Sequence, residues 1–353
     1  MSPAQHGEDH GAGHWKQVLM HLGRASKRGD IAGSRLRLST LVVATMLAVL
    51  ASGFARAQAA DGWPNRPVTV VGPYAAGGNN DVMARMASQW LSEKLNQRFI
   101  VENRVGAGGA LAAAYVAQSA PDGYTLLFAA SPQIGLLPFV QKVNYDPIAD
   151  FVPITAFGSG PFILAINAAI PAKTVEEFVA YAKTRSINYG SAGIASVGQL
   201  SGALFVARNK LNAIHVPFRG GGPAMIALLG GQIDMYFGNA SEILPNVESG
   251  NIRILGVAAD KPLRQLPQIP LIEGNAVPTW NGFFAPAKTP KPIVDKLAQS
   301  LIQATRDPVI SASLLKLGIE PNGITPEEFA DWIKKDQPQF DAAIEAAQLR
   351  QAH

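Results

Sequence analysis

The chain has 353 residues, contains no cysteine and carries a formal net charge of +4 at pH 7. Its length is enough for two domains with buried cores, and without cysteine it can form no disulfide, thiolate metal site or cysteine-linked lipid anchor. Seven of the 30 basic residues and three of the 26 acidic ones lie in the first 60 positions, which leaves 23 of each beyond them. Because nucleic-acid binding needs a basic stripe on the folded part, we predict no nucleic-acid partner.

Residues 1–57 are predicted to be a secretory signal region that is removed. Arg35 and Arg37 precede an uncharged apolar run over residues 38–51, and the small residues Ala55 and Ala57 follow. A basic region, an apolar core and a small-x-small site, in this order, are typical of a cleavable signal peptide. The apolar run is also shorter than the roughly 20 residues that span a bilayer.

The limits of this region stay open. We expect cleavage after Ala57, with Ala59 or Ala60 as alternatives, and an uncleaved anchor is the competing interpretation. Residues 1–34 are longer and more polar than a signal needs, which an over-extended start or a start at Met20 would explain. The exported product is predicted to be soluble and periplasmic.

The mature chain predicts strands that alternate with helices. Its first part predicts strands at 67–74, 99–103 and 124–130, and helices at 80–96 and 106–120. The pattern then restarts, with strands at 161–166, 187–192, 213–218, 233–238 and 252–259 and helices at 174–185, 198–209 and 220–231. After the stretch 280–290, three further helices are expected near 290–306, 308–317 and 326–347.

Alternation of this kind indicates parallel sheets that are covered by helices on both faces. Breaks near residues 155–162 and 277–283 suggest two α/β lobes joined by two hinge crossings. We predict a first lobe of residues 58–160 plus 280–353 and a second lobe of residues 161–279. Such lobes can open and close over a cleft.

The stretch VGPYAAGGNNDVMAR, residues 71–85, offers few side chains for chemistry. In open α/β sheets ligands lie at the C-terminal ends of the strands, where loops lead into helices, and Gly77 and Gly78 would let the backbone come close. Asn79 or Asn80 is expected to cap a helix that begins near Asp81, leaving N–H groups available to an anion. An ordinary strand-to-helix turn is the alternative. Similar glycine-rich or serine-rich turns occur at 106–109, 191–198 and 220–222.

Catalytic and cofactor motifs are absent from the sequence. GSAG at 190–193 lacks one residue of a GxSxG nucleophile elbow, and GAGGAL has Leu111 where the dinucleotide fingerprint needs a small residue. No GxxxxGK[ST] or HExxH motif occurs. His215, in the apolar strand AIHVPF, is expected to be a packed or hydrogen-bonded strand residue. We therefore predict no metal, no cofactor and no enzymatic activity, with a periplasmic hydrolase as one alternative and a structural envelope protein as another.

The chain resembles the Bug family of extracytoplasmic solute receptors, the periplasmic binding components of tripartite tricarboxylate transporters. The resemblance covers residues 62–345 and rests on the ordered strings WPNRPVTVVGPYAAGGNNDVMAR, VENRVGAGG, PDGYTLL, NYDPIADFVPIT, YGSAG, HVPFRGGGPA, LLGGQIDMYF, LPQIP, APAKTPKPIVDKL and TPEEF. It implies the type II periplasmic-binding-protein fold, a small organic carboxylate held in the cleft between the lobes, and delivery to membrane components of the transporter. A monomer is expected, and a ligand sensor that feeds a two-component system remains an alternative.

The resemblance also implies which residues bind the ligand, partly through backbone N–H groups and ordered waters. They are Tyr74, Ala75, Ala76, Gly77, Gly78, Asn79, Asn80, Asp81, Ser131, Ala192, Ser196, Gln199, Gly238, Asn239 and Ala240.

Two positions depart from the family pattern. Residues 196–199 replace a serine-rich turn that commonly ends in histidine, and Gly238 replaces a common aspartate. The second lobe thereby loses a carboxylate that could pair with a ligand ammonium group. We therefore expect an aromatic or aliphatic acid rather than an amino acid.

Overall fold

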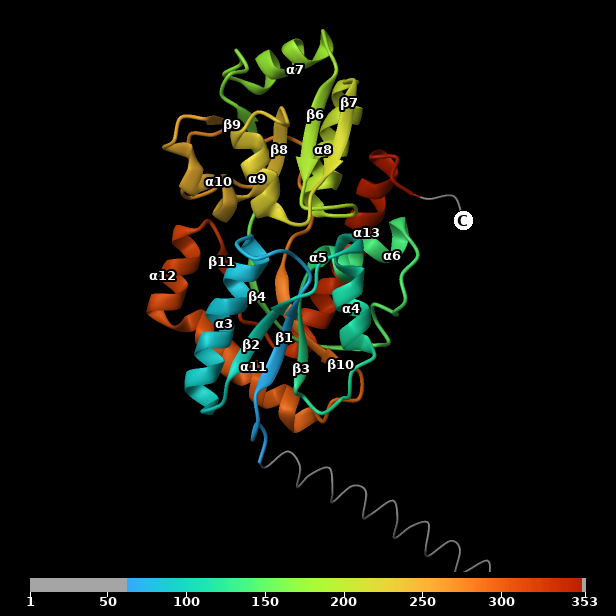
Figure 1. The fold of residues 1–353 in the computed structure, drawn as a ribbon, viewed down its shortest axis with the longest axis vertical. Coiled ribbons are helices and arrows are strands. Elements are labelled where there is room, and N and C mark those ends of the chain that lie inside the picture. The colour runs from blue at the N-terminus through green and yellow to red at the C-terminus, as the bar shows by residue number, and fades with distance from the viewer. Residues whose placement is uncertain (1–61, 351–353) are drawn as a thin grey trace, which may run out of the picture. The chain divides into compact units, whose positions relative to one another are not determined.

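Two β-sheets carry the fold of residues 62–350, the part of the chain that the computed structural model describes (Figure 1). The signal region, its cleavage site and the alternative starts all lie outside the described residues. One sheet has six strands and the other has five, and each is the centre of one α/β lobe.

The six-stranded sheet of the first lobe has the order β11-β4-β10-β3-β1-β2. Its strands are β1 (Val68–Gly72), β2 (Phe99–Asn103), β3 (Thr125–Ala130), β4 (Phe151–Ser159), β10 (Asn281–Pro286) and β11 (Glu320–Pro321). In the parallel core of the sheet, Val70 lies opposite Val101 on one side and Leu126 on the other. Val70 and Leu126 are fully buried, as expected for a strand covered on both faces.

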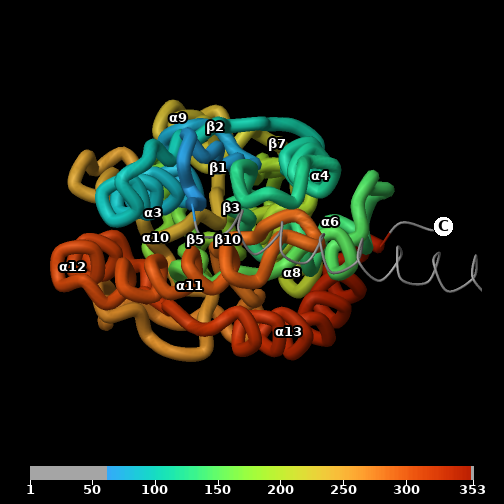
Figure 2. The backbone as a smooth tube through the Cα atoms, turned by 90° about the horizontal axis from the view of Figure 1, so that it is seen from below, coloured from blue at the N-terminus to red at the C-terminus, as the bar shows by residue number. Residues whose placement is uncertain are grey.

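Helices cover both faces of this sheet. They are α3 (Asn79–Leu95), α4 (Ala110–Ala117), α5 (Ser131–Gly135), α6 (Leu137–Val140), α11 (Lys291–Arg306), α12 (Pro308–Lys316) and α13 (Pro326–Ala346), with the 3-10 turn η1 (Ala107–Gly109) before α4. Figure 2 shows α3 and α12 on one side and α4 and α6 on the other. The three C-terminal helices lie close to their predicted ranges. The sequence marks the start of α13, because Pro326 is its first residue and the hydroxyl of Thr325 accepts a hydrogen bond from the amide of Glu328.

The five-stranded sheet of the second lobe has the order β7-β6-β8-β5-β9. Its strands are β5 (Phe162–Asn167), β6 (Ile187–Ser191), β7 (Ala213–Pro217), β8 (Met235–Asn239) and β9 (Ile252–Ala258). The helices of this lobe are α7 (Val175–Lys183), α8 (Val197–Asn209), α9 (Gly221–Leu229) and α10 (Ala240–Val247).

The prediction of parallel sheets is wrong for β5 and β10, the two strands that cross between the lobes, and for the short edge strand β11, which is antiparallel to β4. β10 is antiparallel to β3 and β4, and β5 is antiparallel to β8 and β9. Both strands arrive directly from the other lobe. A strand that enters at the edge where its neighbours end must run in the opposite direction.

The two connections between the sheets are tied to each other. One joins β4 to β5 through Gly160 and Pro161, and the other joins β9 to β10. The hydroxyl of Thr279 donates to the carbonyl oxygen of Gly160 at 2.6 Å and accepts from its amide at 3.4 Å. We propose that the lobes divide at this pair, near residues 160 and 280.

Candidate ligand-binding site

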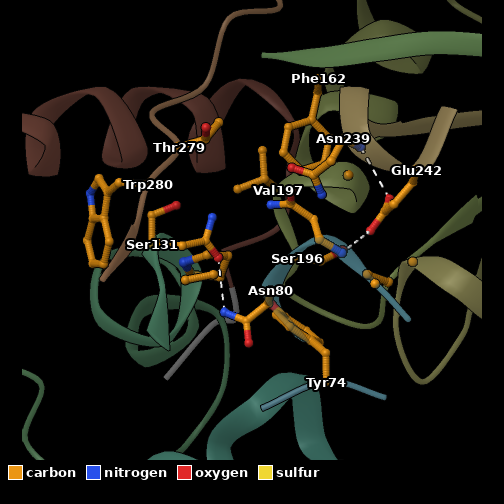
Figure 3. A pocket seen from close by; sticks show the side chains of 18 residues that line it. Tyr74, Asn80, Ser131, Phe162, Ser196, Val197, Asn239, Glu242, Thr279 and Trp280 are labelled. Carbon is orange, nitrogen blue, oxygen red and sulfur yellow. Dashed lines mark hydrogen bonds between the residues drawn. The ribbon is translucent and has the colours of Figure 1, made fainter. Parts of the chain in front are cut away.

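A cavity lies between the two lobes, with residues of both in its lining (Figure 3). Its empty volume, including the open mouth, is about 490 Å³. The lining consists of Tyr74, Gly78, Asn79, Asn80, Ala130, Ser131, Pro132, Phe162, Ala192, Ser196, Val197, Gly198, Gly221, Asn239, Glu242, Thr279, Trp280 and Asn281.

Eight of the fifteen predicted binding residues line this cavity: Tyr74, Gly78, Asn79, Asn80, Ser131, Ala192, Ser196 and Asn239. The other seven lie outside its lining: Ala75, Ala76, Gly77, Asp81, Gln199, Gly238 and Ala240. Among the lining residues outside the predicted fifteen, Phe162, Val197 and Trp280 supply apolar surface and Glu242 supplies a carboxyl group.

The first glycine-rich loop leads directly into α3, which begins two residues earlier than predicted. Its N-cap is Gly78, and neither Asn79 nor Asn80 caps the helix with its side chain. The side-chain nitrogen Nδ2 of Asn80 donates instead to the carbonyl oxygen of Phe128 at 3.2 Å and to the side-chain oxygen of Asn281 at 3.0 Å. The expected cap is therefore wrong, because these contacts turn Asn80 toward β3 and β10.

Several backbone amides of this loop have acceptors within the protein. The amide of Gly77 donates to the carboxylate of Asp81 at 3.0 Å, and the amide of Ala75 donates to the carbonyl oxygen of Arg219 in the second lobe at 3.1 Å. Burial alone would raise the pKa of Asp81, but hydrogen bonds from Arg85, Gly77 and Asn103 outweigh it and hold the pKa below its ordinary value. Asp81 thus holds the loop in place through its hydrogen bond with the amide of Gly77.

Glu242 is the main feature of the site that the sequence analysis did not find. It lies on α10, is 8% exposed, and its Oε1 accepts from the amide of Asn79, in the first lobe, at 3.1 Å. Its Oε2 accepts from the hydroxyl of Tyr236 at 2.7 Å and from the amide of Asn239 at 3.3 Å. Burial raises the pKa of Glu242, whereas these three donors favour the ionised form.

Two glycines make room for this carboxyl group and its partner. A Cβ atom on Gly221 would collide with the carboxyl of Glu242, and a Cβ atom on Gly238 would collide with the ring of Tyr236. The aspartate that is common at position 238 therefore has no space here. The second lobe nevertheless contributes a carboxyl group to the lining, that of Glu242 in the first turn of α10. The sequence signal is the spacing Asn239-x-x-Glu242 at a helix start, which is typical of a capping box.

Helix N-termini from both lobes reach the cavity. The first residues of α3, α8 and α9 and the N-cap of α10 all belong to its lining. A helix N-terminus carries a partial positive charge and presents backbone N–H groups, which favours a bound anion. The lining contains no lysine, arginine or histidine of residues 62–350, so positive potential must come from these backbone dipoles.

Aromatic and aliphatic side chains form the apolar part of the cavity. Figure 3 shows Trp280 on one side of the cavity and Phe162 and Val197 nearer Glu242. The indole of Trp280 packs edge to face on Phe329 at 5.0 Å and donates to the carboxyl of Asp336 at 3.2 Å. Burial raises the pKa of Asp336 to about 6. These contacts hold the indole in one orientation.

The lining residues between Phe162 and Glu242 form the second-lobe wall of the cavity, and the others form the first-lobe wall. His215 lies outside the lining, next to the second-lobe wall, and is a hydrogen-bonded strand residue, as predicted. The side-chain amide of Gln199 lies 3.3 Å from its Nδ1, and Ser191 Oγ lies 2.7 Å from its Nε2. Because Gln199 donates to Nδ1, the proton of the neutral ring is on Nε2, and burial lowers the pKa of His215 to about 4. A ring that is protonated at Nε2 cannot take a proton from Ser191, so this pair does not have the arrangement of a serine nucleophile and its base.

The second glycine-rich loop, Gly106–Gly109, lines a different hollow. That hollow also contains Tyr74, Ala192, Ile194 and Arg219. Within the described range, no group of three or more acidic or histidine side chains could hold a metal ion. Likewise, none of the helices in residues 62–350 has the length and apolar character needed to cross a membrane.

Comparisons with known proteins agree with this geometry. The family model described as tripartite tricarboxylate transporter family receptor matches residues 83–349. A protein from Pseudomonas sp. strain P51, encoded between tcbD and tcbE, is 32% identical over 328 residues, which cover 91% of this chain and 97% of the relative.

Three solved structures are also similar. Rpa4515 of R. palustris, with adipate, is 30% identical and has a TM-score of 0.78, covering 81% of this chain and 98% of its own. MatC from Rhodopseudomonas palustris, with bound malate, is 31% identical with a TM-score of 0.77, covering 80% of this chain and 100% of its own. The periplasmic binding protein BugD is 30% identical with a TM-score of 0.78, covering 82% of this chain and 100% of its own.

Proposed function

Because this chain belongs to the tripartite tricarboxylate transporter receptor family, we propose that it captures a small organic carboxylate between its lobes in the periplasm. It would then deliver the ligand to the membrane components of a transporter of that type. The observation that carries the proposal is the cavity at which helix N-termini of both lobes meet without a cationic side chain. Backbone N–H groups and helix dipoles can bind a carboxylate there.

The similar structures with adipate and malate support the carboxylate class. In this chain, the start of α8 at Ser196–Gly198 is a suitable position for the ligand carboxylate, because Glu242 already accepts from the amides at the starts of α3 and α10. The body of the ligand would then lie against Phe162, Val197 and Trp280. An aliphatic or aromatic acid fits this apolar surface.

Ligand binding should favour the closed arrangement of the lobes. Several hydrogen bonds already join them. Around the cavity these are Asn79 amide to Glu242, Ser241 hydroxyl to the Asn79 side chain at 2.6 Å, and Ala75 amide to the Arg219 carbonyl. Farther along the chain, the side-chain amide of Gln265 donates to the carbonyl oxygen of Leu315 on α12. A ligand stabilises closure only if it makes better contacts with the closed state than with the open one. The cavity provides such contacts because both lobes line it.

A thermal-shift screen against small carboxylates tests the proposal, followed by titration calorimetry of each compound that raises the melting temperature. A ligand that binds only the folded state at 100 times its Kd adds about 2.7 kcal/mol of stability. Val197→Phe should fill part of the cavity and abolish the shift, whereas Val309→Phe, at a side chain that is 74% exposed and is not part of the cavity lining, should retain it. If no carboxylate raises the melting temperature of the wild-type protein, the proposal is wrong. Uptake of a labelled ligand by cells with and without the receptor tests the delivery step.

A further inference from the structure

We propose that Glu242 restricts the ligands of this receptor to carboxylates that present no second negative charge to the second lobe. The inference rests on the proposed function, since it concerns the same cavity. It predicts a preference for monocarboxylates over dicarboxylates of the same length. In this respect the chain would differ from the similar proteins whose structures contain adipate and malate.

Glu242 determines the charge of the side chains that line the cavity. Among the described residues that line the cavity, Glu242 is the one carboxylic acid, and no basic side chain accompanies it. All three of its hydrogen-bond partners, the amides of Asn79 and Asn239 and the hydroxyl of Tyr236, act as donors. Burial raises the pKa of Glu242, but the three donors stabilise its ionised form, and at the pH 7.5 of the test we expect the carboxylate. The side chains of the cavity thus contribute a net negative charge.

Glu242 also limits the positions that remain for a ligand anion. The carboxylate of Glu242 lies where the N-termini of α3 and α10 meet, and it accepts an amide hydrogen from each. The protein's own carboxylate therefore occupies the anion position on these two helices. One ligand carboxylate can still bind at the start of α8, but a second one would have to lie near Glu242.

The side chain of Glu242 cannot turn away from the cavity. Its carboxyl group is packed against Gly221, where a Cβ atom would collide with it, and lies close to Gly78. Tyr236 holds it from the other side, in space that Gly238 leaves open. A second ligand charge would meet a fixed carboxylate in a partly desolvated cavity, where like charges a few ångströms apart repel strongly. We expect this repulsion to weaken binding at least tenfold.

Matched pairs of acids test the inference by titration calorimetry at pH 7.5: hexanoate and adipate, benzoate and terephthalate, and lactate and malate. The wild-type protein should bind the monocarboxylate of at least one pair, and at least tenfold more tightly than its dicarboxylate. Glu242→Gln, which keeps the size of the side chain and removes its charge, should improve dicarboxylate binding at least tenfold. Glu248→Gln, an exposed change at the C-terminal cap of α10, should leave the ratio unchanged.

Other results would contradict the inference. If the wild-type protein binds dicarboxylates as tightly as monocarboxylates, or if Glu242→Gln leaves the ratio unchanged, the inference is wrong while the carboxylate-receptor proposal stands. If no member of any pair and no other carboxylate binds, both proposals are wrong. Circular dichroism and the melting temperature show whether Glu242→Gln is folded, and the wild-type ratio decides the matter if it is not.

Discussion

The two walls of the cavity use the same structural device in different ways. On both sides a strand ends, a short loop follows and a helix begins with its N-terminus toward the cavity. The first-lobe wall is electrically neutral and is held by packing, with Trp280 against Phe329 and Asn80 bonded to Asn281. The second-lobe wall is held by a buried polar network around Glu242. One fold can therefore vary the charge of its binding cavity by placing a carboxylate at its own helix starts.

The largest effect is expected where the first-lobe wall depends on packing. Trp280→Ala removes a side chain that is 1% exposed and leaves Asp336 without its indole donor. We expect the free energy of unfolding to fall by about 3–5 kcal/mol, as for other large-to-small core changes. Urea denaturation measures it. Trp332→Ala, at a half-buried position on α13, should cost clearly less, and equal losses would show that packing does not fix Trp280.

A charge added at position 238 tests the second-lobe wall. Gly238→Asp places a side chain where the ring of Tyr236 lies, which should destabilise the protein by about 2–4 kcal/mol through overpacking and a buried charge. Gly62→Asp, where a Cβ atom would meet open space, is the matched control and should be nearly neutral. If Gly238→Asp is as stable as the wild type, Tyr236 moves aside and does not lock Glu242.

The free energy of unfolding should depend on pH through His215, which lies next to the second-lobe wall. The pKa of His215 is about 4 in the folded protein, below the ordinary value of 6.5, so the unfolded chain binds a proton more readily between these values. The contribution of His215 to stability is therefore complete above pH 6.5 and decreases as the pH falls toward 4. Because the ring is partly exposed, we expect a loss of only about 1–2 kcal/mol.

Urea denaturation of wild type and His215→Gln at pH 7.5, 6 and 4.5 measures this loss. The difference in unfolding free energy between the two proteins should shrink as the pH falls, and Glu242, whose pKa is shifted the other way, affects both equally. Ile214→Gln, at the exposed neighbouring residue, should show no such pH-dependent difference. A constant difference for His215→Gln would mean that the imidazole is not held neutral.

The smallest effect is expected at the junction that both lobes share. Thr279→Val keeps the shape of the side chain but removes the hydrogen bond to the carbonyl oxygen of Gly160, so stability should fall by about 1 kcal/mol. Thr184→Val, at an exposed helix end, should change stability less, because water can replace its hydrogen bond to Tyr181. If the two variants lose the same amount, the contact between the hinge segments adds nothing particular to the fold.

The sequence predicted the features that depend on local pattern. The alternation of strands and helices, the first glycine-rich loop and the three C-terminal helices all follow from periodicity and turn residues. The direction of β5 and β10 could not be predicted in this way, because it depends on which lobe a strand comes from. The cap of α3 was also wrong, since the partners of Asn80 at Phe128 and Asn281 lie 48 and 201 residues away along the chain.

Glu242 shows why part of the cavity lining could not be predicted from the sequence. Its contact with Asn79 joins residues 163 positions apart, and no local spacing reveals such a pair. The substitution at Gly238 suggested that a carboxylate had been lost, whereas the structure shows that one enters from the following helix. The apolar residues Phe162 and Trp280 were missed for a related reason, because a buried aromatic residue in the sequence does not show whether it faces a core or a cavity.

The path of the chain through the two sheets constrains how the polypeptide can reach this structure. β10 lies between β3 and β4 in the first sheet, yet the ribosome makes it only after the whole second sheet. The second lobe is one continuous segment, so its sheet can form from neighbouring stretches of chain. The first sheet cannot be completed until β10 is available. Pairing β10 with β4 closes a long chain segment, which costs conformational entropy and is therefore slow. We therefore expect the second sheet to form before the first is complete.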